Sequence, residues 1–151
     1  MYIRYTCPQG ALLPHSEDDV IRIDVEKQLP LLETFFGRSM EPEDQVRLID
    51  IFRRGLEEDF GVVVDGALIA RAAVVHLPSG VSEIVAVTTR PPFRNRGYAK
   101  QIVGRCAASL HAQGKDAMGI TTADNAAMRA VFETLGFTGT EIAEEDLPKP
   151  E

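Results

Sequence analysis

The sequence predicts an α/β protein in which helices pack on a mixed, mostly antiparallel sheet. Three strand-like segments follow one another between residues 61 and 89, and Asp65-Gly66 between the first two is a strong hairpin signal. Helix-like and strand-like patterns then alternate up to residue 142. Two helix-like segments precede the meander. This order of elements favours a central sheet covered by helices.

The N-terminal region predicts two short strands and a helix. Residues 2–5 suit an edge strand, and residues 20–23 suit a short strand. Residues 25–36 carry apolar side chains at helical spacing, with Asp24 placed to cap the helix. Pro30 lies inside this window, so a kinked helix and two short helices are both open.

A second helix leads into the meander. Ser39 is expected to cap this helix, and Pro42 falls near its first turn, where proline is tolerated. The three strands of the meander are expected at residues 61–64, 67–76 and 82–89. The last of these strands is apolar or β-branched throughout its second half, which suits a central position.

The C-terminal half predicts two helices and two further strands. The first helix has one apolar stripe, formed by Ile102, Val103, Cys106, Ala107 and Leu110. A strand is expected at residues 117–122, a helix capped by Asp124 or Thr122 comes next, and a final strand covers residues 137–142.

Length and composition indicate one globular domain. The 151 residues are 44% hydrophobic and 26% charged, which is ordinary for a soluble protein. We expect residues 1–151 to form a single domain with an N-terminal part (1–60), a core (61–142) and an acidic tail (143–151). Prolines at 148 and 150 favour fraying of that tail into solvent.

Charge and hydropathy exclude several classes of partner. The net charge of −7 argues against nucleic acid, and no apolar run approaches the roughly 20 residues of a membrane span. The N-terminus lacks the basic-then-apolar pattern of a secretory signal. Cys7 and Cys106 have neither metal nor redox spacing, so no metal is expected. A reducing cytoplasm is the simplest location.

An anion-binding turn lies between the strand at 82–89 and the helix that follows it. The turn reads Arg94-Asn95-Arg96-Gly97-Tyr98-Ala99, and Arg90 and Lys100 add further positive charge in an acidic chain. A helix N-terminus presents unpaired N–H groups and a partial positive charge, and Gly97 leaves the backbone open to a phosphate. The Lys-Ser/Thr of a nucleotide-binding P-loop is missing.

The turn Arg-x-x-Gly-x-Ala resembles the acetyl-CoA-binding motif of the GNAT superfamily of acyl-CoA-dependent N-acyltransferases. The longer stretch VTTRPPFRNRGYA matches that motif throughout, and residues 125–137 resemble the second motif of the family, a helix that opens at Asn and closes in Gly-Phe. The resemblance implies a GNAT-like three-layer fold with a mostly antiparallel sheet splayed at the cofactor strand, after Thr88. It also implies N-acetyl transfer from acetyl-CoA by direct transfer.

The resemblance implies particular residues for the cofactor. The N–H of Val87 is expected to meet the thioester carbonyl, and Thr89 to pair with the pantetheine arm. The full expected cofactor set is Val87, Thr88, Thr89, Arg94, Asn95, Arg96, Gly97, Tyr98, Ala99, Asn125 and Phe132.

Glu83 is the expected catalytic base. It precedes Arg94 by eleven residues, where some family members carry a catalytic glutamate, and strand periodicity places it on one face with Val85, Val87 and Thr89. A role limited to orienting the substrate is the alternative for Glu83, and His76 is the weaker candidate base.

The thiolate has no obvious proton donor. Family members often carry a tyrosine seven residues after the asparagine of the second motif, and this position is Phe132 here. Water, the released ammonium proton or Tyr98 are the open alternatives.

A non-catalytic acyl-CoA-binding module is the alternative to an enzyme, because of Phe132. The expected partner is a small-molecule or peptide amine, and a homodimer stays open. Acidic residues hint at a cationic acceptor, although a solvated helix face explains them more simply: Glu41, Glu43, Asp44, Glu57, Glu58 and Asp59.

Overall fold

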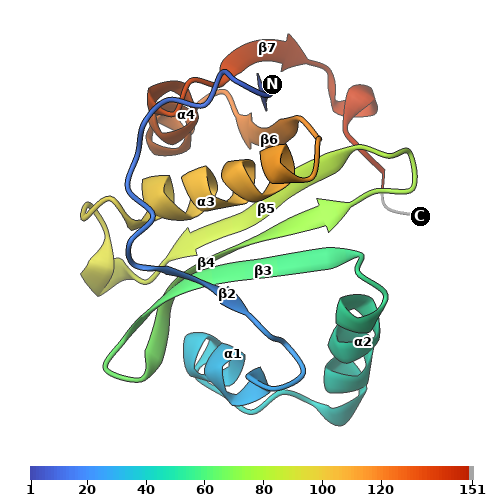
Figure 1. The fold of residues 1–151 in the computed structure, drawn as a ribbon, viewed down its shortest axis with the longest axis vertical. Coiled ribbons are helices and arrows are strands. Elements are labelled where there is room, and N and C mark those ends of the chain that lie inside the picture. Colours follow the sequence, from blue (N-terminus) through green and yellow to red (C-terminus); the bar gives the residue numbers. More distant parts are fainter. Residues whose placement is uncertain (150–151) are drawn as a thin grey trace.

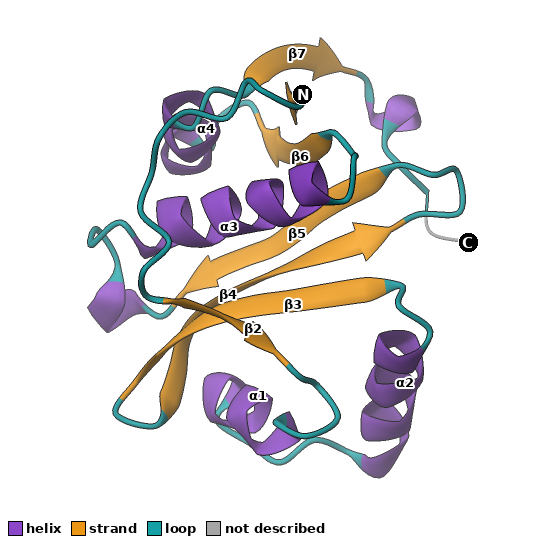
Figure 2. Cartoon of the chain, viewed as in Figure 1, coloured by secondary structure: helices purple, strands orange, loops and turns teal. Residues whose placement is uncertain are grey.

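The computed structural model describes residues 1–149 and shows one seven-stranded mixed sheet with helices on both faces (Figures 1 and 2). The strand order is β2-β3-β4-β5-β6-β1-β7. The strands are β1 (Tyr2–Cys7), β2 (Val20–Ile23), β3 (Glu57–Val64), β4 (Ala67–His76), β5 (Ser82–Thr89), β6 (Ala117–Thr122) and β7 (Thr138–Ile142). The helices are α1 (Leu29–Phe36), α2 (Pro42–Arg53), α3 (Tyr98–Ala112) and α4 (Ala126–Thr134), with short 3-10 turns at Pro91–Phe93 and Glu144–Asp146. The predicted α/β class and antiparallel β3-β4-β5 meander are confirmed.

The two faces of the sheet carry separate apolar cores. The larger core joins the buried stripe of α3 to Ala70, Ala72 and Val74 of β4, and we call this side of the sheet the α3 face. The smaller core joins Leu32 of α1 to Leu68 and Ile23, and we call its side the α1 face. A register shift between Val62 and Val63 of β3 accompanies the change from one core to the other. The sheet is therefore the middle of three layers.

The N-terminal strand lies inside the sheet. β1 pairs antiparallel with both β6 and β7, so the prediction of an edge strand at residues 2–5 was wrong. The last strand of the chain, β7, pairs along β1 and takes the edge position. A local pattern of apolar residues does not reveal which distant strand will pair beside it.

β5 and β6 are joined by a single parallel pairing, Ile84 with Gly119. Beyond that pair the two strands separate, and the sheet opens between them. The predicted splay is therefore present, but it begins after Ile84 and not after Thr88. In Figure 1 α3 and α4 lie beside the opening, one next to each of the diverging strands.

β5 contains a β-bulge just after its pairing with β6. Ala86 has φ 56°, a left-handed conformation that is uncommon for alanine, and the pairing register with β4 shifts between Arg71 and Ala73. Val85 lies opposite Ala73 and Glu83 opposite Val75, on the α1 face, whereas Thr89 lies opposite Ala70 on the α3 face. The prediction that Glu83, Val85, Val87 and Thr89 share one face was wrong, because the extra residue inverts the alternation of side chains.

Several predicted helix boundaries move. α1 begins at Leu29 with Gln28 as its N-cap, and Pro30 lies in its first turn, where proline causes no kink. Glu41, and not Ser39, is the N-cap of α2. β3 starts at Glu57, four residues before the predicted start.

The last helix and the tail complete the fold. The N-cap of α4 is Asn125, and not Asp124 or Thr122; its side chain accepts a hydrogen bond from the N–H of Met128 at 3.1 Å. The segment after β7 forms the turn Glu144–Asp146, and residues 150–151 of the predicted fraying tail lie outside the described residues. Across residues 1–149, no helix combines the length and apolarity needed to cross a membrane.

Candidate functional site

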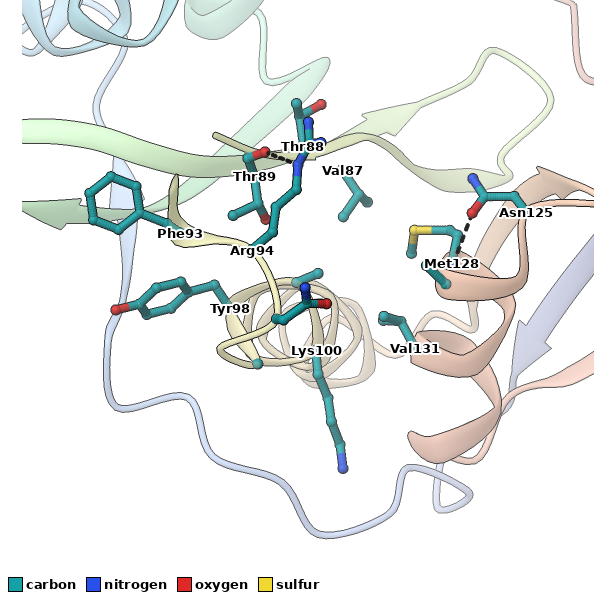
Figure 3. A pocket seen from close by; sticks show the side chains of 14 residues that line it. Val87, Thr88, Thr89, Phe93, Arg94, Tyr98, Lys100, Asn125, Met128 and Val131 are labelled. Carbon is teal, nitrogen blue, oxygen red and sulfur yellow. Dashed lines mark hydrogen bonds between the residues drawn. The ribbon is translucent and has the colours of Figure 1, made fainter. Parts of the chain in front are cut away.

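A groove of about 660 Å³ lies between the end of β5, the N-terminus of α3 and the flank of α4 (Figure 3). We call it the main groove. Nine of the eleven residues expected to contact the cofactor line it: Val87, Thr88, Thr89, Arg94, Asn95, Gly97, Tyr98, Ala99 and Asn125. Figure 3 shows Val87 on one side, with Met128 and Val131 of α4 on the other. Segments about 40 residues apart in the sequence therefore meet around one opening.

The N-terminus of α3 opens into the main groove without a side-chain cap. Gly97 is the N-cap residue, with φ 83°. The space beside its Cα is open, because a Cβ placed there would meet no atom within 4 Å. The first turn of α3 carries no acidic side chain. The unpaired N–H groups and the positive end of the helix dipole are thus free to receive an anion.

The two arginines of the turn have different surroundings. The Nε of Arg94 donates a hydrogen bond to the carbonyl oxygen of Thr89 at 3.0 Å, and Arg94 lines the main groove. The Arg96 guanidinium lies over the ring of Phe93, 5.4 Å from its centroid, and Arg96 does not line the groove. Of the two arginines, Arg94 is therefore the one whose guanidinium could reach an anion in the groove.

Phe132 is part of the core and does not line the main groove. It is 2% exposed, stacks on Tyr5 with centroids 5.0 Å apart, and contacts Phe137 at 5.1 Å. Its assignment as a cofactor-binding residue does not fit this position, because the apolar face of α4 turns Phe132 toward β6 and β1. Met128 and Val131 face the groove in its place.

Tyr98 lines the main groove but its hydroxyl points away from the α4 side. In Figure 3 the hydroxyl lies on the far side of the groove from Asn125 and Met128. Tyr98 is thus poorly oriented to protonate a leaving group held near Val87.

Glu83 lies beside a second cavity, of about 450 Å³. Tyr2, Ile120 and Leu147 also line this second cavity, and Asn125 lines both it and the main groove. Burial raises the pKa of the Glu83 carboxyl above its ordinary value. A carboxylate with a raised pKa next to a groove is suited to accept a proton.

His76 is bound within a polar network away from both cavities. Its Nε2 lies 2.7 Å from Glu58 Oε2, and its Nδ1 lies 2.7 Å from Ser82 Oγ. Glu58 also accepts hydrogen bonds from Ser109 and Gln113 at the end of α3. The network ties α3 to β3 and β4, so the structure does not bring His76 to the site.

The family model described as FR47-like protein matches residues 60–145, which is more than half of the chain. The chain belongs to this family, within the GNAT superfamily. The matched residues include β5, the arginine-glycine turn and α4, so they contain both motifs that suggested the superfamily. No curated protein matches the chain in sequence.

Several solved structures of GNAT-family proteins have the same fold. A GNAT-family structure from Novosphingobium aromaticivorans is 21% identical, with TM-score 0.67; the match covers 92% of this chain and 60% of that one. A GNAT-family acetyltransferase from Colwellia psychrerythraea is 19% identical, with TM-score 0.71, and the match covers 91% and 52%. The chain thus spans little more than half the length of these two.

The match to a third solved structure covers almost all of that chain. It is the aminoglycoside N-acetyltransferase AAC(6')-Iy in complex with CoA, which is 22% identical with TM-score 0.65; the match covers 83% of this chain and 95% of that one. At these identities the likeness shows the GNAT fold.

Some groove residues escaped sequence reasoning. Met128 and Val131 follow Asn125 at spacings of three and six residues, so the helical repeat places them on the flank beside it. The same spacing also fits the buried stripe of a core helix, so the pattern alone does not separate the two positions. The lining of the second cavity by Tyr2 and Leu147 had no local signal, because the two residues lie at opposite ends of the chain.

Proposed function

We propose that the FR47-like chain is an N-acetyltransferase that moves the acetyl group of acetyl-CoA directly to a primary amine. The observation that carries the proposal is the main groove, which runs from the uncapped N-terminus of α3 to the opening between β5 and β6. One end offers anion-binding groups, and the other reaches Asn125, which borders the cavity of Glu83.

The donor end of the groove fits a CoA pyrophosphate. The N–H groups around Gly97 and Ala99 and the guanidinium of Arg94 supply hydrogen bonds to phosphate oxygens, and Thr89 and Val87 continue along β5 toward the opening. In this arrangement the backbone N–H at Val87 receives the thioester carbonyl. As negative charge develops on the carbonyl oxygen, this N–H stabilises it.

Glu83 acts as the base in the proposed reaction. It takes a proton from the acceptor ammonium, directly or through a water molecule, and the free amine attacks the thioester carbon. The C–N bond forms and the C–S bond breaks. The CoA thiolate then takes a proton from the ammonium or from water, because Phe132 has no proton to give and Tyr98 points elsewhere.

The compartment proposed is a reducing cytoplasm. Cys7 and Cys106 are both free and buried, and neither lines the main groove. Burial raises the pKa of both thiols, which keeps them protonated and unreactive. Neither cysteine is therefore a candidate for a covalent acyl intermediate.

A non-catalytic acyl-CoA-binding module is the second candidate. The observation that favours it is the lack of an evident proton donor for the thiolate, since Phe132 is buried in the core and the hydroxyl of Tyr98 points away from the α4 side. Such a module would bind acetyl-CoA in the main groove and release no thiol with any amine.

Substitution Glu83→Gln tests the proposal. We expect unchanged acetyl-CoA affinity and a transfer rate lower by about 10²–10⁴, the usual effect of removing a general base. In the wild type the rate rises with pH as Glu83 deprotonates, above the ordinary glutamate range. The variant lacks the rise in rate that comes from deprotonation of Glu83. Its rate deficit relative to the wild type becomes smaller at high pH, because more of the amine is then already deprotonated.

Glu57→Gln is the matched control, since Glu57 is also a half-buried carboxyl with a raised pKa but lines neither the main groove nor the second cavity. Equal rates in the wild type and Glu83→Gln would remove Glu83 as the base. Tight acetyl-CoA binding without thiol release to any amine would instead favour the binding module.

A further inference from the structure

The β5 bulge places donor and acceptor on different faces of the sheet. Thr89, which lines the main groove, lies opposite Ala70 on the α3 face, whereas Glu83 lies opposite Val75 on the α1 face. If Glu83 is the base, the ammonium must reach it from the α1 face. The acceptor therefore enters on the side of the sheet that α3 does not cover.

The second cavity lies at this entry. A Cβ on Gly119 of β6 would collide with Phe132 of the α3-face core, so its neighbour Ile120 points to the opposite side, the α1 face. Tyr2 pairs with Thr122 next to it, and Leu147 and Pro148 from the C-terminal segment complete the wall. Glu83 lies at one edge, and Asn125 connects this cavity to the main groove.

The lining of the second cavity has one charged side chain, a polar side formed by Thr121, Thr122 and Asn125, and a separate apolar side. Among its described residues Glu83 is the charged side chain, while Ile120, Leu147, Pro148 and the ring of Tyr2 offer carbon surface. A ligand with one ammonium group matches this pattern. A carboxylate on the ligand would meet Glu83 without any cation of the lining to balance it.

Two further acidic residues on the α1 face, Glu57 and Asp59, lie outside the second cavity. Val75 of β4 pairs with Glu57 on one side and with Glu83 on the other, so the two glutamates are two strand spacings apart, roughly 10 Å between Cα atoms. Asp59 beside Glu57 pairs with Arg71 at 3.2 Å. Neither Glu57 nor Asp59 lines the second cavity.

We propose that the second cavity is the acceptor site and that the acceptor is a small primary amine with a single positive charge and an apolar carbon skeleton. Its ammonium lies at Glu83, and its carbon chain lies between Ile120 and the C-terminal residues Leu147 and Pro148. This inference rests on the proposed acetyl transfer and adds the class of acceptor to it.

An amine panel tests the inference in the wild-type protein with acetyl-CoA. Hexylamine and 1,5-diaminopentane have nearly the same shape, but the second carries another charge that would lie against Ile120 and Leu147. We expect kcat/KM for hexylamine to exceed that for 1,5-diaminopentane by about 10-fold or more, and that for ethylamine by a similar factor. Glycine, which carries a carboxylate, should be the poorest acceptor.

Substitution of the wall provides the second measurement. Leu147→Asp and Ile120→Asp each add a carboxylate opposite Glu83, and we expect either one to shift the preference toward 1,5-diaminopentane by about 10-fold or more. Acetyl-CoA affinity should stay unchanged, since neither residue lines the main groove. Val46→Asp is the control, because Val46 is 69% exposed and lines neither cavity.

Binding of hexylamine to the CoA complex, measured by calorimetry, gives a readout independent of turnover. We expect Leu147→Asp to weaken it and Val46→Asp to leave it unchanged. This inference is overturned if the wild type transfers acetyl groups preferentially to the diamine or to glycine. It is also overturned if both wall variants keep the wild-type preference. Neither result contradicts the proposed transfer. If no amine of any class causes thiol release from acetyl-CoA, the proposed transfer itself is overturned.

Discussion

The two faces of β5 border two different cavities. On the α3 face, Val87 and Thr89 line a groove whose phosphate end is built from consecutive residues, 94–99. On the α1 face, Glu83 borders a cavity whose other walls come from β1, β6 and the C-terminal segment. Under the proposed assignment, the donor site is encoded in one short motif, whereas the acceptor site depends on tertiary pairing.

The largest expected effect is on the donor side. Gly97→Val places a branched side chain at the N-cap of α3, where a pyrophosphate would approach, and we expect CoA affinity to fall by about 100-fold or more. Gly114→Val is the matched control, since Gly114 also has positive φ (75° against 83°) and equally open space around its Cβ. Valine at either position introduces similar backbone strain. If calorimetry shows that both variants lose CoA binding, the loss is caused by misfolding and not by a blocked phosphate site.

The next effect separates the two arginines of the turn. Arg94→Ala should weaken CoA by about 1.5–3 kcal/mol, the value of a charge-assisted phosphate bond, and should affect pantetheine little. Arg96→Ala should cost clearly less, because the Arg96 guanidinium packs over Phe93 outside the main groove. Titrations of both variants with CoA and pantetheine decide the matter; equal losses for the two arginines would contradict the assignment.

A substitution in the core tests whether the missing tyrosine can be restored. In Phe132→Tyr the new hydroxyl would project from Cζ, and this atom already lies 2.4 Å from the position of a Cβ on Gly119. We expect a loss of about 1–3 kcal/mol in the free energy of unfolding from an unpaired buried hydroxyl, with no gain in transfer rate. Denaturant titration gives the first quantity and thiol release the second. A faster variant would show that position 132 can reach the leaving group after all.

The smallest effect concerns the acidic pair on the α1 face. Burial, and then the charge of Asp59, raise the pKa of Glu57 from 4.5 to about 7. The folded state therefore holds a proton more tightly than the unfolded chain, so stability present below pH 4.5 is lost as pH rises through about 7. Glu57→Gln should remove this decline, by about 1 kcal/mol after discounting for the partial exposure of Glu57. Thermal unfolding at pH 4.5 and pH 8 measures it, and identical pH dependence in both proteins would contradict the shift.

Sequence reasoning succeeded where the structure is local. The hairpin at Asp65-Gly66, the meander and the turn before α3 were all predicted, since each depends on residues within a few positions of one another. Nine of the expected cofactor residues line one groove for the same reason.

The failures share a physical cause, which is pairing between distant segments. The bulge at Ala86 inverts which side chains of β5 face α3, and no residue type in EIVAV announces it, because alanine rarely adopts positive φ. The interior position of β1 depends on the later strand β7. Phe132 and Met128 both look like core residues in the helical pattern of α4, and only the position of α3 decides which of them faces the groove.

The single pairing between Ile84 and Gly119 has a consequence for how the chain unfolds. The strands β2 to β5 form one block and β6, β1 and β7 form another, with one backbone pair and the packing of α3 and α4 between them. Such a junction favours two cooperative opening units, and amide exchange should show different opening free energies for Val74 and Tyr5. CoA in the main groove would contact β5 in one unit and the Asn125 end of α4 in the other. Bound CoA would then hold the two blocks together, and its release would let them open independently.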